Sequence, residues 1–168
     1  MQFYLAIIFC YGLLVNNSQH FSPTKTIEKN GMQVSWQLRG DYLEVEVFGP
    51  TDGWVAIGFN EKSGLKGTNL IMANVVDGKA TVADHYIVGV GDPRKIKDLD
   101  GGRAHIDQVS GSEGSEGTSV KFRIYRKAKD PYHFDLMQQR QYYMLLAYSQ
   151  ADEFEHHSIM RTETRIEL

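Results

Sequence analysis

Gly53-Trp54-Val55-Ala56-Ile57-Gly58-Phe59-Asn60 is the stretch that decides the fold. Apolar side chains occupy consecutive positions in it instead of alternating with polar ones, and turn-forming residues at 49–53 lead into it. A short unbroken apolar run of this kind predicts a strand that is buried on both faces. A second such run, within 142–148, lies near the C-terminus. The two runs predict the buried strands of an all-β domain.

Regular alternation of apolar and polar residues surrounds these runs. Residues 32–38 and 43–47 alternate on either side of the turn Gly40-Asp41, which predicts an antiparallel hairpin. Further strands are predicted at 70–76, 79–88, 120–124 and 162–168, with Asp77-Gly78 as a tight turn. We therefore expect an antiparallel, immunoglobulin-like β-sandwich with at most one short helix, starting near Asp130. Residues 89–119 read as loop, and the Gly/Ser/Glu-rich part at 110–119 is expected to be mobile and solvated.

Length and composition exclude several classes of protein. The chain has 168 residues, 42% of them hydrophobic and 23% charged, which suits one soluble domain with its own core. The net charge of −3 is spread along the chain, so nucleic acid is not an expected partner. The nucleophile-elbow, phosphate-loop and His-Glu-x-x-His motifs are missing. We expect no catalytic activity of the chain itself.

The N-terminal segment predicts export. Residues 1–19 contain no charged side chain, and the apolar part at 3–15 is too short to span a bilayer. We interpret 1–19 as a signal peptide, 20–29 as a lead-in and 30–168 as the folded domain, secreted or periplasmic and without a membrane span after cleavage. The only cysteine, Cys10, lies in the signal, so the mature chain would have no thiol or disulfide.

The order of these features resembles the DOMON domain family over roughly residues 30–168. The resemblance rests on the following residues and motifs: Trp36, Gly40-Asp41, the run 53–59, Gly67-Thr68-Asn69, Asp77-Gly78 with Val82, Asp84 and Tyr86, the strand Leu145-Leu146-Ala147, and a histidine before the last strand. It implies an exported immunoglobulin-like sandwich that binds haem or sugars. Haem-binding relatives include the cytochrome domains of extracellular redox enzymes, which hold b-type haem through one Met and one His.

Carried over position by position, the resemblance places the histidine ligand on His157, with His156 beside it. The family's methionine falls on Leu65, and the nearest methionine is Met72. Two alternatives follow: Met72 ligates from a different position, or the second ligand is absent. His85 is a further candidate ligand.

Aromatic residues could form the wall of such a haem pocket, or could be ordinary core: Trp54, Phe59, Tyr86, Tyr148 and Phe154. Met72 could likewise be a core filler. If His156 and His157 are in a strand, only one of them can face the pocket, because neighbours in a strand point to opposite sides. An upstream carboxylate, from Glu153 or Glu155, could fix the tautomer of an imidazole.

The expected function is that of an exported module that binds b-type haem and exchanges electrons with a redox partner protein. The first alternative is a haem-free module of the same fold that binds a carbohydrate or small apolar ligand by stacking on Trp54 or a tyrosine. A minor alternative is a copper site that uses His20 as the first mature residue.

Overall fold

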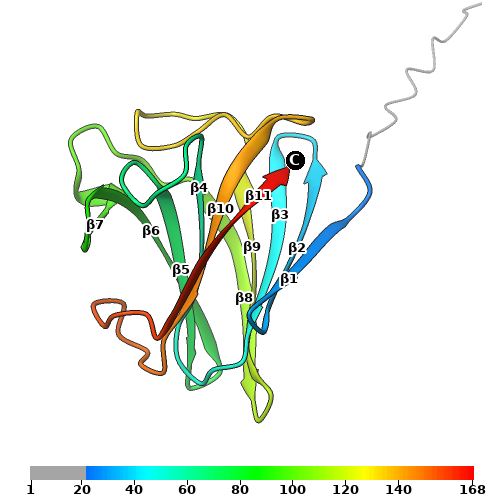
Figure 1. Ribbon diagram of the computed structural model, residues 1–168, viewed down its shortest axis with the longest axis vertical. Helices are drawn as coiled ribbons and strands as arrows, with labels where there is room; N and C mark the ends of the chain where they lie inside the picture. Colours follow the sequence, from blue (N-terminus) through cyan, green and yellow to red (C-terminus); the bar gives the residue numbers. More distant parts are fainter. Residues whose placement is uncertain (1–21) are drawn as a thin grey trace, which may run out of the picture.

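Two antiparallel β-sheets face each other in the computed structural model, which describes residues 22–168 (Figure 1). The five-stranded sheet has the order β1-β2-β3-β9-β8, and the six-stranded sheet has the order β11-β10-β4-β5-β6-β7. The strands are β1 (Lys25–Lys29), β2 (Met32–Arg39), β3 (Tyr42–Gly49), β4 (Val55–Asn60), β5 (Asn69–Val76), β6 (Lys79–Gly89), β7 (Asp92–Lys95), β8 (Ile106–Gly114), β9 (Gly117–Tyr125), β10 (Gln141–Tyr148) and β11 (Met160–Glu167). The expected all-β antiparallel sandwich is confirmed.

Strand alternation builds the core between the sheets. On β2, every second side chain from Met32 to Leu38 is buried, and β3 and β9 repeat this pattern. The same core takes in Ile57 and Phe59 of β4 and Tyr142 of β10. The other side chains of the five-stranded sheet face water, which explains the polar residues between the apolar ones.

The centre of the six-stranded sheet is buried on both sides, as its unbroken apolar runs predict. All six residues of β4 are buried, and so are seven of the eight on β5. The side chains of Val55, Ile57 and Phe59 on β4 and of Ile71, Ala73 and Val75 on β5 join the core between the sheets. Ala56, Leu70 and Met72 face the other way and belong to a second apolar cluster on the outer face of the sheet, which also contains residues of neighbouring segments: Trp54, Ile87, Leu145 and Ala147, with Leu65 and Phe154 packed against them. We call this the outer cluster.

The prediction of a loop over residues 89–119 is wrong. This segment contains β7, β8 and the start of β9, and residues 110–114 pair with 117–121 in a regular hairpin. The pattern is hidden because β8 is an edge strand whose side chains are mostly exposed, so it needs no apolar alternation. A bulge near Gln108, whose φ is +50°, shifts its register against β9.

Two smaller differences concern the N-terminal lead-in and the helix. The lead-in contains β1, which adds an edge strand next to β2. The one helix in the described part of the chain is a 3₁₀ turn, η1 (Ile96–Asp98), and not the helix expected near Asp130, where the chain forms turns.

Buried titratable side chains anchor the segment between β9 and β10. His133 contacts Asp130 through Nδ1 at 2.7 Å and Asp84 of β6 through Nε2 at 2.8 Å. Burial opposes a charged ring, but the hydrogen bonds and charges of the two carboxylates raise the pKa of His133. His105 stacks on this ring at 4.0 Å, and both of its ring nitrogens are buried without a partner. We call these four residues the His–Asp cluster.

The predicted signal peptide, Cys10 and His20 lie outside the described residues. Between residues 22 and 168, the structure contains no helix that is long and apolar enough to cross a membrane.

Candidate functional site

A pocket of about 300 Å³ opens over the outer cluster. Its floor comes from β4, β5 and β10, and its walls come from the segment before β5, the β6–β7 turn and the loop between β10 and β11. That last loop projects away from the sandwich next to the six-stranded sheet (Figure 1). The lining residues are Trp54, Ala56, Leu65, Leu70, Met72, Ile87, Gly91, Asp92, Pro93, Leu145, Ala147, Phe154, Glu155, His156, His157, Ser158 and Arg161.

Small side chains in the middle of the sheet create the hollow. In the strand register, Arg161 lies opposite Ala147, Ala147 opposite Ala56, and Ala56 opposite Met72. In the next row across the strands, Leu145 and Leu70 are larger, and the side chain of Thr68 lies over Gly58, the residue between them. The two alanines therefore leave a shallow apolar channel that runs between Met72, at the centre of the sheet, and Arg161, on its edge strand.

Both predicted histidines line this pocket. They lie in a loop and not in a strand, so the argument that only one of them can face the pocket does not apply. His156 Nδ1 is 3.5 Å from a carboxylate oxygen of Glu153, a contact that the sequence suggested. The exposed ring of His157 makes no hydrogen bond or ion pair with any residue in 22–168, so its nitrogens are available to a ligand.

Backbone contacts fix the course of this loop. The amide of Trp54 donates to the carbonyl of Ala151, and the amide of Ser149 donates to the carbonyl of Trp54, both at 3.0 Å. The hydroxyl of Ser149 donates to the carbonyl of His157 at 3.1 Å. The start of the loop is thus tied to the strand that provides the floor, and His157 is tied to that start.

Met72 lies in the floor of the pocket and is 3% exposed. Leu65, at the position where the resemblance places a methionine, lines the same pocket. The structure therefore brings the two histidines, His156 and His157, together with Met72 and Leu65 from a distant part of the sequence.

The predicted aromatic residues divide between two faces. Trp54 and Phe154 line the pocket, but Phe59 and Tyr148 pack into the core between the sheets, and Tyr86 packs against Tyr132 with ring centroids 5.3 Å apart. His85 is buried on β6 opposite Leu70, with its ring 6.3 Å from that of Phe154. Burial lowers the pKa of His85.

Sequence reasoning missed several residues of the lining, among them Ile87, Leu145 and Arg161. The apolar side chains of Ile87 and Leu145 could have been found from the unbroken runs, because half of such a run must face away from the core. Arg161 gives no signal in the sequence, since an exposed arginine on an edge strand is ordinary.

The residues of the pocket fit a b-type haem. Imidazole and thioether are among the side chains that ligate haem iron, and the apolar floor suits a porphyrin. Trp54 also leaves a buried Nε1 donor without a partner. No three His, Cys, Asp or Glu side chains within residues 22–168 are grouped to hold a bare metal ion.

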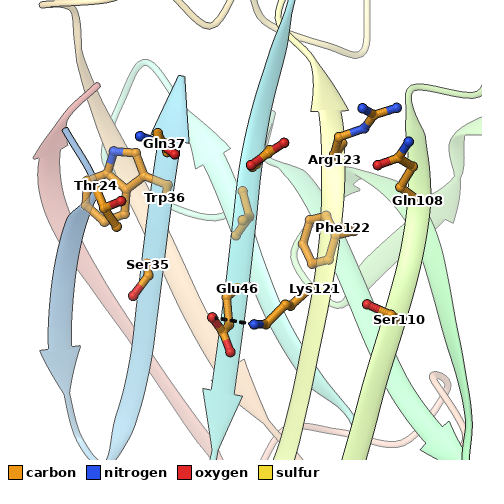
Figure 2. A pocket seen from close by; sticks show the side chains of 12 residues that line it. Thr24, Ser35, Trp36, Gln37, Glu46, Gln108, Ser110, Lys121, Phe122 and Arg123 are labelled. Carbon is orange, nitrogen blue, oxygen red and sulfur yellow. Dashed lines mark ion pairs between the residues drawn. The ribbon is translucent and has the colours of Figure 1, made fainter. Parts of the chain in front are cut away.

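A second hollow, of about 340 Å³, crosses the outer face of the five-stranded sheet (Figure 2). Its lining is polar, and its charges are matched: Lys121 lies 3.2 Å from Glu46, and Arg123 lies 2.9 Å from Asp107. The two rings that line it, Trp36 and Phe122, are only 4% and 2% exposed, so neither offers a stacking surface. The pocket over the outer cluster is therefore the stronger candidate site.

Comparison with known proteins agrees with this architecture. Two similar solved structures are the cytochrome b domain of pyranose dehydrogenase from Coprinopsis cinerea, with a TM-score of 0.64 at 11% identity, and the cytochrome domain of Myriococcum thermophilum cellobiose dehydrogenase, with 0.60 at 12%. Each similarity covers 86% of this chain and 81% of the other, and at this identity it shows the fold.

A search of curated protein sequences gave no significant match. The model of the DOMON domain matches residues 28–149, which is more than half of the chain. The chain therefore belongs to the DOMON domain family.

Proposed function

We propose that this domain binds b-type haem in the pocket over the outer cluster, with His157 as one axial ligand and Met72 as the other, and that it transfers electrons to or from a partner protein outside the cytoplasm. The observation that carries the proposal is that one apolar pocket is lined by both His157 and Met72. The likeness to two cytochrome domains supports it.

The side chains of the pocket have separable tasks in this proposal. His157 offers a ring nitrogen without a competing partner, while Met72 offers a thioether from a floor that is closed to solvent. The alanines of β4 and β10 make room for a flat ligand, and Phe154 and Leu65 exclude water at its sides. Bound haem would supply reversible one-electron chemistry, with a reduction potential that a methionine ligand raises.

The test is a titration of purified haem-free protein with haemin, followed by absorbance. We expect a Soret band that sharpens on reduction with dithionite in the wild type. His157→Ala should lose most of the affinity because it removes a ligand, and His156→Ala, its neighbour in the same loop, is the matched control. Circular dichroism would verify that both variants fold.

Met72→Leu tests the second ligand, because this exchange conserves volume and usually costs less than about 1.5 kcal/mol of stability. If Met72 ligates, the variant binds haemin with a changed spectrum of the reduced form. An unchanged spectrum would reject Met72. Equal binding by the wild type and His157→Ala would reject the proposed site.

The haem-free alternative, a module that binds a carbohydrate, makes a different prediction. A sugar site would need an accessible ring face, and Trp54 is only 3% exposed. Binding of soluble oligosaccharides without any binding of haemin would favour that alternative.

A further inference from the structure

Charges around the pocket point to an acidic group on its ligand. The two carboxylates in the lining already have cationic neighbours: Asp92 lies 2.5 Å from Arg94, and Glu155 lies 4.0 Å from Lys95. Arg161 is the remaining permanent charge of the lining. Its guanidinium makes no ion pair or hydrogen bond with any residue in 22–168.

The nearest acid on the same strand face does not compensate this charge. Glu163 is two residues along β11, so it points to the same side as Arg161. Its carboxylate accepts hydrogen bonds from the hydroxyl of Ser63 at 2.6 Å and from the amide of Gly64 at 2.9 Å. Other exposed arginines, such as Arg39 and Arg140, each lie within 2.8 Å of a carboxylate oxygen.

The strand register indicates the shape that the rest of the ligand must have. From Arg161 the channel passes over Ala147 and Ala56 to Met72. Three interstrand spacings correspond to about 14 Å. The channel is apolar along its length, and only its end at Arg161 is cationic. The buried Nε1 of Trp54 is one more hydrogen-bond donor without a partner. This arrangement suits a flat apolar body with a carboxylate at one end.

We propose that Arg161 binds a carboxylate of the ligand and so fixes which edge of the ligand lies against β11. The inference rests on the pocket of the proposed function, and for a b-type haem the acid would be a propionate. A guanidinium holds a carboxylate through two parallel hydrogen bonds, which orients the ligand as well as attracting it.

The test compares protoporphyrin IX with its dimethyl ester, by fluorescence titration of the haem-free protein. Neither probe contains iron, so axial ligation does not contribute, and only the first has free carboxylates. Arg161→Gln should weaken binding of the acid about ten- to hundredfold and leave binding of the ester unchanged, because a charge-assisted hydrogen bond is lost. Arg161→Lys should recover part of the loss.

Arg165→Gln is the matched control, since Arg165 is exposed on the same face of β11 but does not line the pocket. An equal loss for acid and ester in Arg161→Gln, no loss for either, or no binding of protoporphyrin IX by the wild type would each overturn the inference. A parallel haemin titration separates the two proposals. If haemin binds no better than protoporphyrin IX, axial ligation fails, while the acid–ester comparison still decides the role of Arg161.

Discussion

Leu65 shows how a single side chain can set the chemistry of the pocket. It lines the pocket at the position where the resemblance places the methionine of haem-binding relatives. Leu65→Met keeps the volume nearly constant and should cost less than about 1.5 kcal/mol of stability. Since Met72 already supplies a thioether in the proposed function, the exchange is made in the Met72→Leu background, where it adds a thioether back to the wall. There we expect haemin affinity and the reduction potential to return towards the wild-type values, measured by absorbance titration and spectroelectrochemistry.

Leu70→Met is the control for this exchange, because Leu70 lines the same pocket from β5. A double variant with the affinity and potential of Met72→Leu alone would mean that this wall is too far from the ligand to contribute a donor.

Strand parity decides which candidate residues could be identified from the sequence. His156, His157, Met72, Trp54 and Phe154 do line one pocket. Trp54 and Phe59 are an odd number of residues apart in one extended segment, so they must point to opposite faces. In a run that is apolar on both sides, hydrophobicity alone cannot show which face belongs to the core. Phe59 could have been excluded from the pocket only if its face of β4 had first been assigned to the core.

At the scale of elements, Gly53 ties the loop between β10 and β11 to the sheet. A Cβ atom at this position would lie 2.6 Å from the carbonyl oxygens of Ser149 and Ala151, which are backbone atoms that cannot move aside. Gly53→Ala should therefore shift the start of the loop and cost about 1–3 kcal/mol of unfolding free energy, measured by urea denaturation. Haemin affinity should also fall, because His157 is carried by the same loop.

Gly114→Ala provides the comparison, since a Cβ atom there meets nothing within 4 Å. If Gly53→Ala left both stability and haemin affinity unchanged, the loop would be free to adjust, and its anchoring would not position His157.

The elements also differ in how far the sequence could predict them. The hairpin of β2 and β3 could be predicted from the alternation of apolar and polar residues around Gly40-Asp41, because one face of the hairpin is buried and the other is exposed to solvent. β8 could not be predicted, because backbone pairing with β9 stabilises it while most of its side chains are exposed. Polar edge strands carry little signal in hydrophobicity.

For the molecule as a whole, the His–Asp cluster contributes to the dependence of stability on pH. Burial, and then the charge of His133, lower the pKa of His105 from 6.5 to about 4. Between these two pH values His105 is protonated in the unfolded chain but not in the folded chain. The free energy of unfolding therefore falls by about 3 kcal/mol as the pH drops through this range. His133 has a raised pKa, so its contribution is complete below about pH 6.5 and is lost as the pH rises through its folded value.

His105→Phe separates these effects. It keeps a ring against His133 and removes the titrating nitrogens, so unfolding free energies measured by urea at pH 7 and about pH 4.5 should differ by less than in the wild type. His156→Phe, in an exposed loop, should leave the difference unchanged. A His105→Phe protein that loses as much stability on acidification as the wild type would place the titration elsewhere.

The burial of β4 on both sides limits how this sequence can evolve. A charged side chain would be buried in apolar surroundings at each consecutive position from Val55 to Phe59. On β2, by contrast, every second position can accept such a change. Homologous chains are therefore expected to vary freely on the outer face of the five-stranded sheet and to remain constrained on the outer face of the six-stranded sheet. Low sequence variability would then mark the face that carries the function.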